Sequence, residues 1–283
     1  MTVAHAFRRS LAPLGILLLT LPLAAQGPAL KVRIIQTNMA GDSLQVIDPV
    51  TNRVIGEIKG IEANHGVAPA PDGSRLYVVN EPDRTVDVVD GKTLKVIKQI
   101  PLSGPPNNLA ISKDGRRVYV SMHGDPFGVD VIDSATMTNA KRLPLNGRRI
   151  HNTYVTPDGK WVVAGSDDES FEVAIIDQKT EQQVRTIKLT NRPRPMSFST
   201  NPDGSTKYLV AGISGLLGFV VVDFATGEEV KRVNFPDMGG LRMLRVNAAR
   251  GNPNHGIGVQ PDNKAVWVSD RQFNMVHAYS MTD

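Results

Sequence analysis

Residues 71–93 read PDGSRLYVVNEPDRTVDVVDGKT and contain both signals that recur along this chain of 283 residues. One signal is a Pro-Asp-Gly turn followed by an apolar run, and the other is an apolar run that ends in Asp-x-x-Thr. The Asp-x-x-Thr aspartates are 42 to 46 residues apart, and the turns keep in phase with them until a final step of 59 residues. A repeat of this length with two hairpin turns has room for four short strands, which is the size of one propeller blade. The aspartates of the two signals are Asp48, Asp90, Asp133, Asp177 and Asp223, and Asp72, Asp114, Asp158, Asp203 and Asp262.

Four strands are evident in the second repeat, at residues 65–69, 76–80, 85–90 and 95–100. They are rich in Val, Ile and Tyr and are separated by turn residues. No stretch keeps a helical period over several turns. We therefore expect an all-β protein, a β-propeller of four-stranded antiparallel blades around a central channel.

The ends of the repeat array do not match each other. If the strands of a blade are named a to d from the channel outward, the first repeat begins at strand b (32–36) and the last stops after strand c (276–280). We therefore expect a propeller domain over residues 26–283 that is truncated to about six repeats and incomplete at its C-terminus. A tightly closed six-bladed ring is the alternative.

Three apolar strands that follow the turns, 76–80, 118–121 and 266–270, resemble the YVTN-type β-propeller repeat family. The resemblance covers roughly residues 32–283. It implies a seven-bladed propeller that is periplasmic, secreted or on the cell surface. The family's roles are varied, so the resemblance is informative about fold rather than function.

The first 25 residues have the pattern of a secretory signal peptide. Arg8 and Arg9 precede an apolar run at 11–23, which Ala24 and Ala25 follow. The run is too short to span a bilayer. The paired arginines also resemble a twin-arginine signal, so the export route stays open. We expect a periplasmic or secreted protein with no transmembrane segment after cleavage.

Composition excludes several classes of function. Residues 26–283 hold 30 Lys and Arg against 28 Asp and Glu, with no concentrated basic stripe, so no nucleic-acid partner is expected. The chain has no cysteine, which excludes disulfides, thiolate-bound zinc, covalently attached c-type haem and a cysteine nucleophile. The repeated aspartates are expected to accept backbone N–H groups in Asx-turns rather than to perform acid–base chemistry.

Three histidines occupy the same point of the repeat. His65, His151 and His255 each lie six residues before a proline, at the entry to strand a, and Asn107 fills that point in the third repeat. Side chains there surround the upper mouth of a propeller channel, and their neighbours are polar or basic. The candidate ligand-binding residues are Asn64, His65, Asn107, Arg149, His151, Asn152, Arg194, Asn254 and His255.

Three interpretations of this cluster stay open. Arginine and histidine together suit a small anionic ligand. Three neutral imidazoles, from His65, His151 and His255, suit a divalent metal ion such as Zn²⁺ or Cu²⁺. The same residues could instead cap backbone groups and line a water-filled channel. His123 and His277 are off the register and are expected at surface or inter-strand positions.

One short stretch points toward an enzyme. Residues 254–257, 261–262 and 267–270 resemble the repeat of streptogramin lyase-type propellers, in which a channel histidine works with acidic residues and a metal. The resemblance implies His255 and Asp270 as candidate catalytic residues. A shorter aspartate stands here at the place of the family's acidic residue.

The sequence therefore predicts a propeller that binds a small anionic ligand or a metal at the upper mouth of its channel. A metal-assisted lyase or lactonase-like hydrolase is one alternative, and a surface or scaffold protein with a protein partner at the rim is another. An insertion at 235–253 precedes His255 and is expected to belong to the same mouth.

Overall fold

The computed structural model describes residues 32–236 and 253–282. Within these two segments the chain forms only strands and turns, and Arg33–Asp283 is one compact unit. No helix there is long and apolar enough to cross a membrane. The signal peptide predicted at 1–25 and most of the insertion, 237–252, lie outside the described residues.

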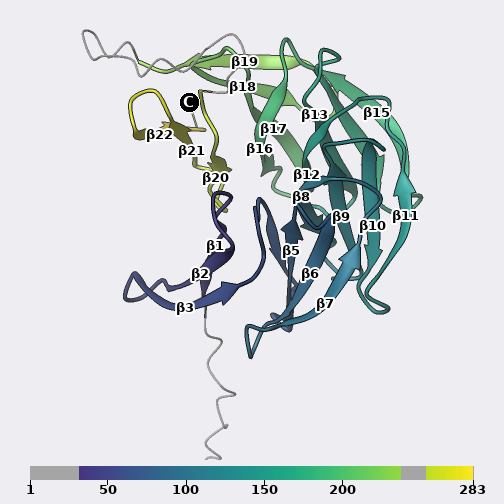
Figure 1. Cartoon of the computed structure of the whole chain (residues 1–283). Helices are drawn as coiled ribbons and strands as arrows, with labels where there is room; N and C mark the ends of the chain where they lie inside the picture. Colours follow the sequence, from purple (N-terminus) through teal and green to yellow (C-terminus); the bar gives the residue numbers. More distant parts are fainter. Residues whose placement is uncertain (1–31, 237–252, 283) are drawn as a thin grey trace, which may run out of the picture. The chain divides into compact units, whose positions relative to one another are not determined.

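The described strands form six antiparallel sheets, each built from strands that are consecutive in the sequence (Figure 1). Four sheets have four strands, and the first and last have three. This arrangement confirms the all-β propeller.

The first two sheets contain β1 (Ile34–Gln36), β2 (Ser43–Asp48) and β3 (Arg53–Lys59), then β4 (Val67–Pro69), β5 (Arg75–Asn80), β6 (Thr85–Asp90) and β7 (Val96–Pro101). The next two contain β8 (Pro106–Ile111), β9 (Arg117–Met122), β10 (Gly128–Asp133) and β11 (Thr138–Leu143), then β12 (Ile150–Val155), β13 (Trp161–Ser166), β14 (Glu172–Asp177) and β15 (Gln182–Lys188). The last two contain β16 (Pro193–Thr200), β17 (Thr206–Ile213), β18 (Gly218–Asp223) and β19 (Glu229–Asn234), then β20 (Ile257–Val259), β21 (Ala265–Asp270) and β22 (Met275–Ser280).

Neighbouring sheets pack face to face and share cores. The innermost strand of one sheet contacts that of the next from β4 through β8, β12 and β16 to β20. Val163 and Ile175 of one sheet and Leu209 and Val220 of the next belong to one buried cluster. The inner strands are therefore apolar on both faces, as a stacked repeat requires.

The repeated aspartates have the predicted structural role. The Asp90 carboxylate accepts the backbone N–H groups of Thr93 at 2.6 Å and Lys92 at 3.1 Å. The bond from Thr93 is the main cause that lowers the pKa of Asp90. Gly73 and Asn263 supply the left-handed conformation of the other turns, with φ of 70° and 58°.

Both turn types lie at the same end of every blade, because strand direction alternates along a sheet. We call this end the lower face. The starts of β4, β8, β12, β16 and β20 and the turns between the two middle strands lie at the opposite end, the upper face.

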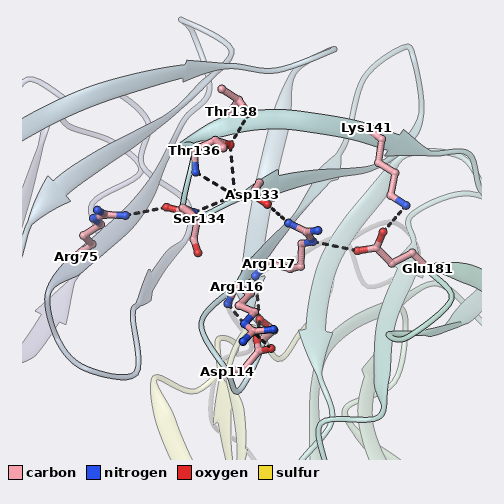
Figure 2. A network of polar contacts seen from close by, with 12 residues as sticks. Arg75, Asp114, Arg116, Arg117, Asp133, Ser134, Thr136, Thr138, Lys141 and Glu181 are labelled. Carbon is pink, nitrogen blue, oxygen red and sulfur yellow. Dashed lines mark hydrogen bonds and ion pairs between the residues drawn. The ribbon is translucent and has the colours of Figure 1, made fainter.

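Polar bridges join neighbouring blades at the lower face (Figure 2). Arg117 pairs with Asp133 of its own sheet and, at 3.5 Å from its Nε, with Glu181 of the next sheet, which also pairs with Lys141. One blade earlier, Arg75 donates to the Ser134 carbonyl at 2.8 Å. An arginine at the start of the second strand thus reaches the next blade in both places.

Candidate functional site

The ring of His151, near the start of β12, is engaged at both nitrogens. Arg194 Nη1 lies 2.9 Å from His151 Nε2, and Asn152 Oδ1 lies 2.6 Å from His151 Nδ1. Because a guanidinium only donates, Nε2 must accept and Nδ1 must carry the proton. Burial, followed by the charge of Arg194, lowers the pKa of His151 to about 4. His151 is therefore a neutral imidazole whose free lone pair is already used by Arg194.

Arg194 is fixed on its other side by Asp167, which follows β13. Arg194 Nη2 donates to Asp167 Oδ2 at 2.9 Å, and the aspartate side chain is only 6% exposed. Burial would raise the pKa of Asp167, but the hydrogen bond with His123 and the charge of Arg194 outweigh it and lower the pKa. Asp167 Oδ1 and Arg194 Nε are buried and have no hydrogen-bond partner among the described residues. The ion pair therefore keeps unused hydrogen-bonding capacity.

His123, which was expected at a surface or inter-strand position, also contacts this group. Its ring lies edge-on to that of His151, 5.6 Å between centroids, and its Nε2 is 3.6 Å from Asp167 Oδ2. Exposed Arg149 lies 3.2 Å from the same nitrogen and 4.0 Å from Asp167. His123 follows β9 directly, so it sits in an upper-face turn between two strands. We call His123, Arg149, His151, Asp167 and Arg194 the upper cluster.

A cavity of about 200 Å³, the upper cavity, adjoins the upper cluster. His255 lines it, and its backbone N–H bonds Ser269 Oγ at 3.1 Å, whereas its ring makes no hydrogen bond within the described segments. His255 is an exposed residue at the edge of the cavity, where the partial desolvation of its ring and then the charges of Arg271, Arg194 and His65 lower its pKa. His255 is therefore a neutral imidazole with a free lone pair at neutral pH. The cavity is lined by Asn108, His151, Asn152, Tyr154, Arg194, Pro195, Met196, His255, Gly256 and Ile257.

His65 lies near this cavity but does not line it. Its Nδ1 is 3.1 Å from Glu81 Oε2, and its charge contributes to the lowered pKa of His255. The structure thus brings His151, His255 and Arg194 to one cavity and places His65 beside it, paired with an acid.

Three of the predicted amides serve the backbone or the core instead. Asn64 is fully buried and donates to the Ile61 carbonyl at 2.6 Å, and Asn254 is fully buried and donates to the Gly218 carbonyl. Asn107 is 5% exposed within β8. Asn64 and Asn254, each directly before a histidine, turn into the sheet, where their amides bond buried backbone carbonyls.

The predicted metal and catalytic arrangements are not assembled in the part of the chain that the structure describes. No group of three or more His, Cys, Asp or Glu side chains there is placed to hold a metal ion. Asp270 accepts the N–H of Gln272 at 2.8 Å and lies 3.0 Å from His277 Nε2. Asp270 therefore contacts His277 of the neighbouring strand β22 and not His255. His277 lies at the inter-strand position expected for it.

Sequence reasoning missed Glu81, His123 and Asp167, although they share a register. Each is the first residue after the second strand of its blade, following Asn80, Met122 and Ser166. The residues at this point face the same end of the blade as the strand-a histidines. Aligning the repeats at the first residue after the second strand, as was done for the histidines before strand a, could have found them.

The stability of the folded chain should depend on pH through His151. Its folded pKa of about 4 lies below the ordinary 6.5, so the unfolded chain takes up a proton first as pH falls. The contribution of neutral His151 to the free energy of unfolding is complete above pH 6.5. It decreases as the pH falls to about 4, by up to about 3 kcal/mol in all. Urea unfolding at pH 6.5, 5.5 and 4.5 should show a shallower decline for His151→Asn than for the parent. Equal declines, or an imidazole pKa near 6.5 by NMR, would contradict this.

Comparison with known proteins matches this chain to one family model and to several relatives. The family model for the cytochrome d1 heme domain matches residues 34–234. Protein NirF of Pseudomonas aeruginosa is 28% identical over 216 residues, covering 73% of this chain and 54% of NirF. The chain spans about half the length of the curated relatives it matches.

Two solved structures share the fold. Hydrazine synthase of Kuenenia stuttgartiensis aligns with a TM-score of 0.73 at 24% identity, covering 88% of this chain and 73% of that one. Dihydro-heme d1 dehydrogenase NirN in complex with DHE aligns with a TM-score of 0.60 at 18% identity, covering 93% and 67%. At these identities the structural likeness supports the propeller fold alone.

Proposed function

This chain belongs to the cytochrome d1 heme domain family, and we propose that its upper face binds an anionic, heme-type ligand, an iron tetrapyrrole that carries carboxylates. The observation that supports this most is the pairing, at one cavity, of a fixed arginine with an unengaged neutral imidazole. Arg194 would bind a carboxylate, and His255 would bind the iron. NirN, a dihydro-heme d1 dehydrogenase whose structure is a complex with DHE, supports this ligand class.

The donor set fits such a ligand. Iron in tetrapyrroles commonly accepts a neutral imidazole, and the lowered pKa keeps His255 neutral. Carboxylates bind best to arginine N–H groups that are already oriented. When bound, the ligand would supply an iron centre able to take axial ligands and exchange electrons.

The residues around Arg194 prepare it for an anion. Asp167 and His151 hold the guanidinium in place, so little side-chain freedom is lost on binding. With His151 neutral, the charges of Arg149 and Arg194 exceed that of Asp167, which leaves the upper cluster positive. The buried Nε of Arg194 still lacks an acceptor among the described residues.

A bare divalent ion held by three histidines is not part of this proposal. The lone pair of His151 is used by Arg194, and His65 is paired with Glu81. His255 is left as a single ligand, which suits an iron already held by four tetrapyrrole nitrogens better than a free ion.

We also propose a periplasmic or secreted location. The support is the basic and apolar pattern of residues 1–25, together with the strands that resemble YVTN-type repeats.

A pair of histidine variants tests the assignment of the iron ligand. His255→Ala should abolish the imidazole-ligated absorption spectrum in a titration with iron protoporphyrin IX and weaken binding at least tenfold. His65→Ala is the matched control and should keep the parent spectrum, because that ring is paired with Glu81. A parental spectrum in His255→Ala would reject His255 as the ligand.

A further inference from the structure

Three side chains that can carry a positive charge converge on one oxygen atom of the upper cluster. Arg194 Nη2, His123 Nε2 and Arg149 Nη2 lie 2.9, 3.6 and 4.0 Å from Asp167 Oδ2. The other carboxylate oxygen, Oδ1, is buried and has no hydrogen-bond partner among the described residues. The three side chains therefore share one acceptor, while a second acceptor on the same carboxylate stays available.

The Nε2 atom of His123 has both a donor and an acceptor within reach. Arg149 Nη2 is 3.2 Å from it, and Asp167 Oδ2 is 3.6 Å from it. Because a guanidinium only donates, a neutral His123 ring can accept from Arg149 through Nε2. A protonated ring can only donate, so it favours Asp167 and repels Arg149. The two charge states of His123 therefore select different partners.

Arg149 is able to follow this change of partner. Its side chain is 53% exposed, and in the described part of the chain its guanidinium forms polar contacts with His123 and Asp167 only. The backbone of Arg149 is left-handed, with a φ of 51°. Asparagine adopts this conformation more readily than most residues with a Cβ, so Arg149→Asn removes the charge without adding backbone strain.

The second imidazole of the upper cluster does not compete for the proton. His151 has a pKa of about 4 and so stays neutral above pH 5. Its ring faces that of His123 edge-on, 5.6 Å between centroids. A histidine side chain ordinarily titrates near pH 6.5. The groups that face His123 are thus one neutral ring, His151, one cation, Arg149, and one anion, Asp167.

We propose that His123 couples proton uptake to anion binding at the upper cavity. On protonation, its imidazolium pairs with Asp167, Arg149 turns away, and Arg194 shares its carboxylate with a second cation. The added positive charge and the loosened hold on Arg194 both favour an incoming carboxylate, so affinity rises as pH falls. By linkage, a bound anion favours protonation of His123 to the same extent. His123 is a positioning residue here, and the inference rests on the proposed anion-binding function.

Absorption titrations at two pH values test the coupling. Iron protoporphyrin IX and its dimethyl ester are titrated into the full chain at pH 8.0 and pH 6.0. The ratio of the two affinities isolates the contribution of the carboxylates, because both compounds present the same iron to His255. For the parent this ratio should be about threefold larger at pH 6.0, the low end of common coupling energies. Protonation of the ligand's own carboxylates would change the ratio in the opposite direction.

Two histidine variants locate the proton. In His123→Asn the ratio should be the same at both pH values, because no side chain beside Asp167 then titrates in this range. His65→Asn is the matched control, since His65 lies near the cavity but is paired with Glu81. This variant should keep the parental increase at pH 6.0.

NMR of the ligand-free chain gives a measurement that does not depend on the tetrapyrrole. The pH midpoint of the His123 ring resonances should fall in Asp167→Asn, which removes the anion, and rise in Arg149→Asn, which removes the cation. Unchanged midpoints in both variants would reject the coupled cluster. Preference for the free acid with the same ratio at both pH values, or a parental increase in His123→Asn, would reject the coupling alone. No preference for the free acid at either pH would reject the proposed function as well.

Discussion

Arg194→Ala is expected to lower the free energy of unfolding by about 3 kcal/mol, because it leaves a buried carboxylate without its closest cation. Asp167 is 6% exposed and accepts from Arg194 at 2.9 Å. His123 and Arg149 are more distant, at 3.6 and 4.0 Å, and can compensate only partly. The same variant should lose carboxylate binding at the upper cavity. Urea unfolding at pH 7 measures the first effect.

Two further variants separate the ion pair from other losses. Adding Asp167→Asn to Arg194→Ala removes the unpaired charge and should recover much of the stability. Arg192→Ala is the matched control, since Arg192 lies 3.8 Å from a Glu169 side chain that is 89% exposed. Such a pair contributes less than about 1 kcal/mol. If the double variant were as unstable as Arg194→Ala, Asp167 would not be the cause.

Ile175→Ala is expected to cost about 2–5 kcal/mol, the range for truncating a large buried aliphatic side chain. Ile175 in β14 is 1% exposed and belongs to the cluster shared with Leu209 and Val220 of the next sheet. The cavity left behind would lie between two blades, where both backbones are fixed by their own ladders. Thermal or urea unfolding followed by circular dichroism measures it.

Val184→Ala in the same sheet is the control. Val184 in β15 is 55% exposed, so its truncation should change stability by less than about 0.5 kcal/mol. Similar effects of both substitutions would mean that the inter-blade cluster is not a close-packed core.

The strand pattern was predictable because its causes are local. The second repeat was predicted to have strands at 65–69, 76–80, 85–90 and 95–100, and β4 to β7 lie within two residues of those bounds. Hairpin turns depend on a few adjacent residues, such as Asp72 and Gly73, and these fix the phase of the alternating strands.

The candidate site was predictable only in part. The shared register predicted that His65, His151 and His255 would meet at one cavity with Arg194 beside them, and in the structure His151, His255 and Arg194 line a cavity that His65 does not line. It did not identify Asn64 and Asn254 as buried backbone partners, because the direction of a side chain depends on the sheet it meets. Asp167 and His123 were missed for a related reason. Their contacts with Arg194 and His151 join residues that are up to 28 positions apart, on different blades.

The most direct test of the account compares iron protoporphyrin IX with its dimethyl ester, which keeps the iron but lacks free carboxylates. Absorption titrations of the purified chain should show saturable one-to-one binding of the free acid with an imidazole-ligated spectrum. The ester should bind at least tenfold more weakly, because Arg194 then has no carboxylate to pair with. Equal binding of both compounds, or no spectral change with either, would contradict an upper face that recognises an anionic tetrapyrrole through Arg194 and His255.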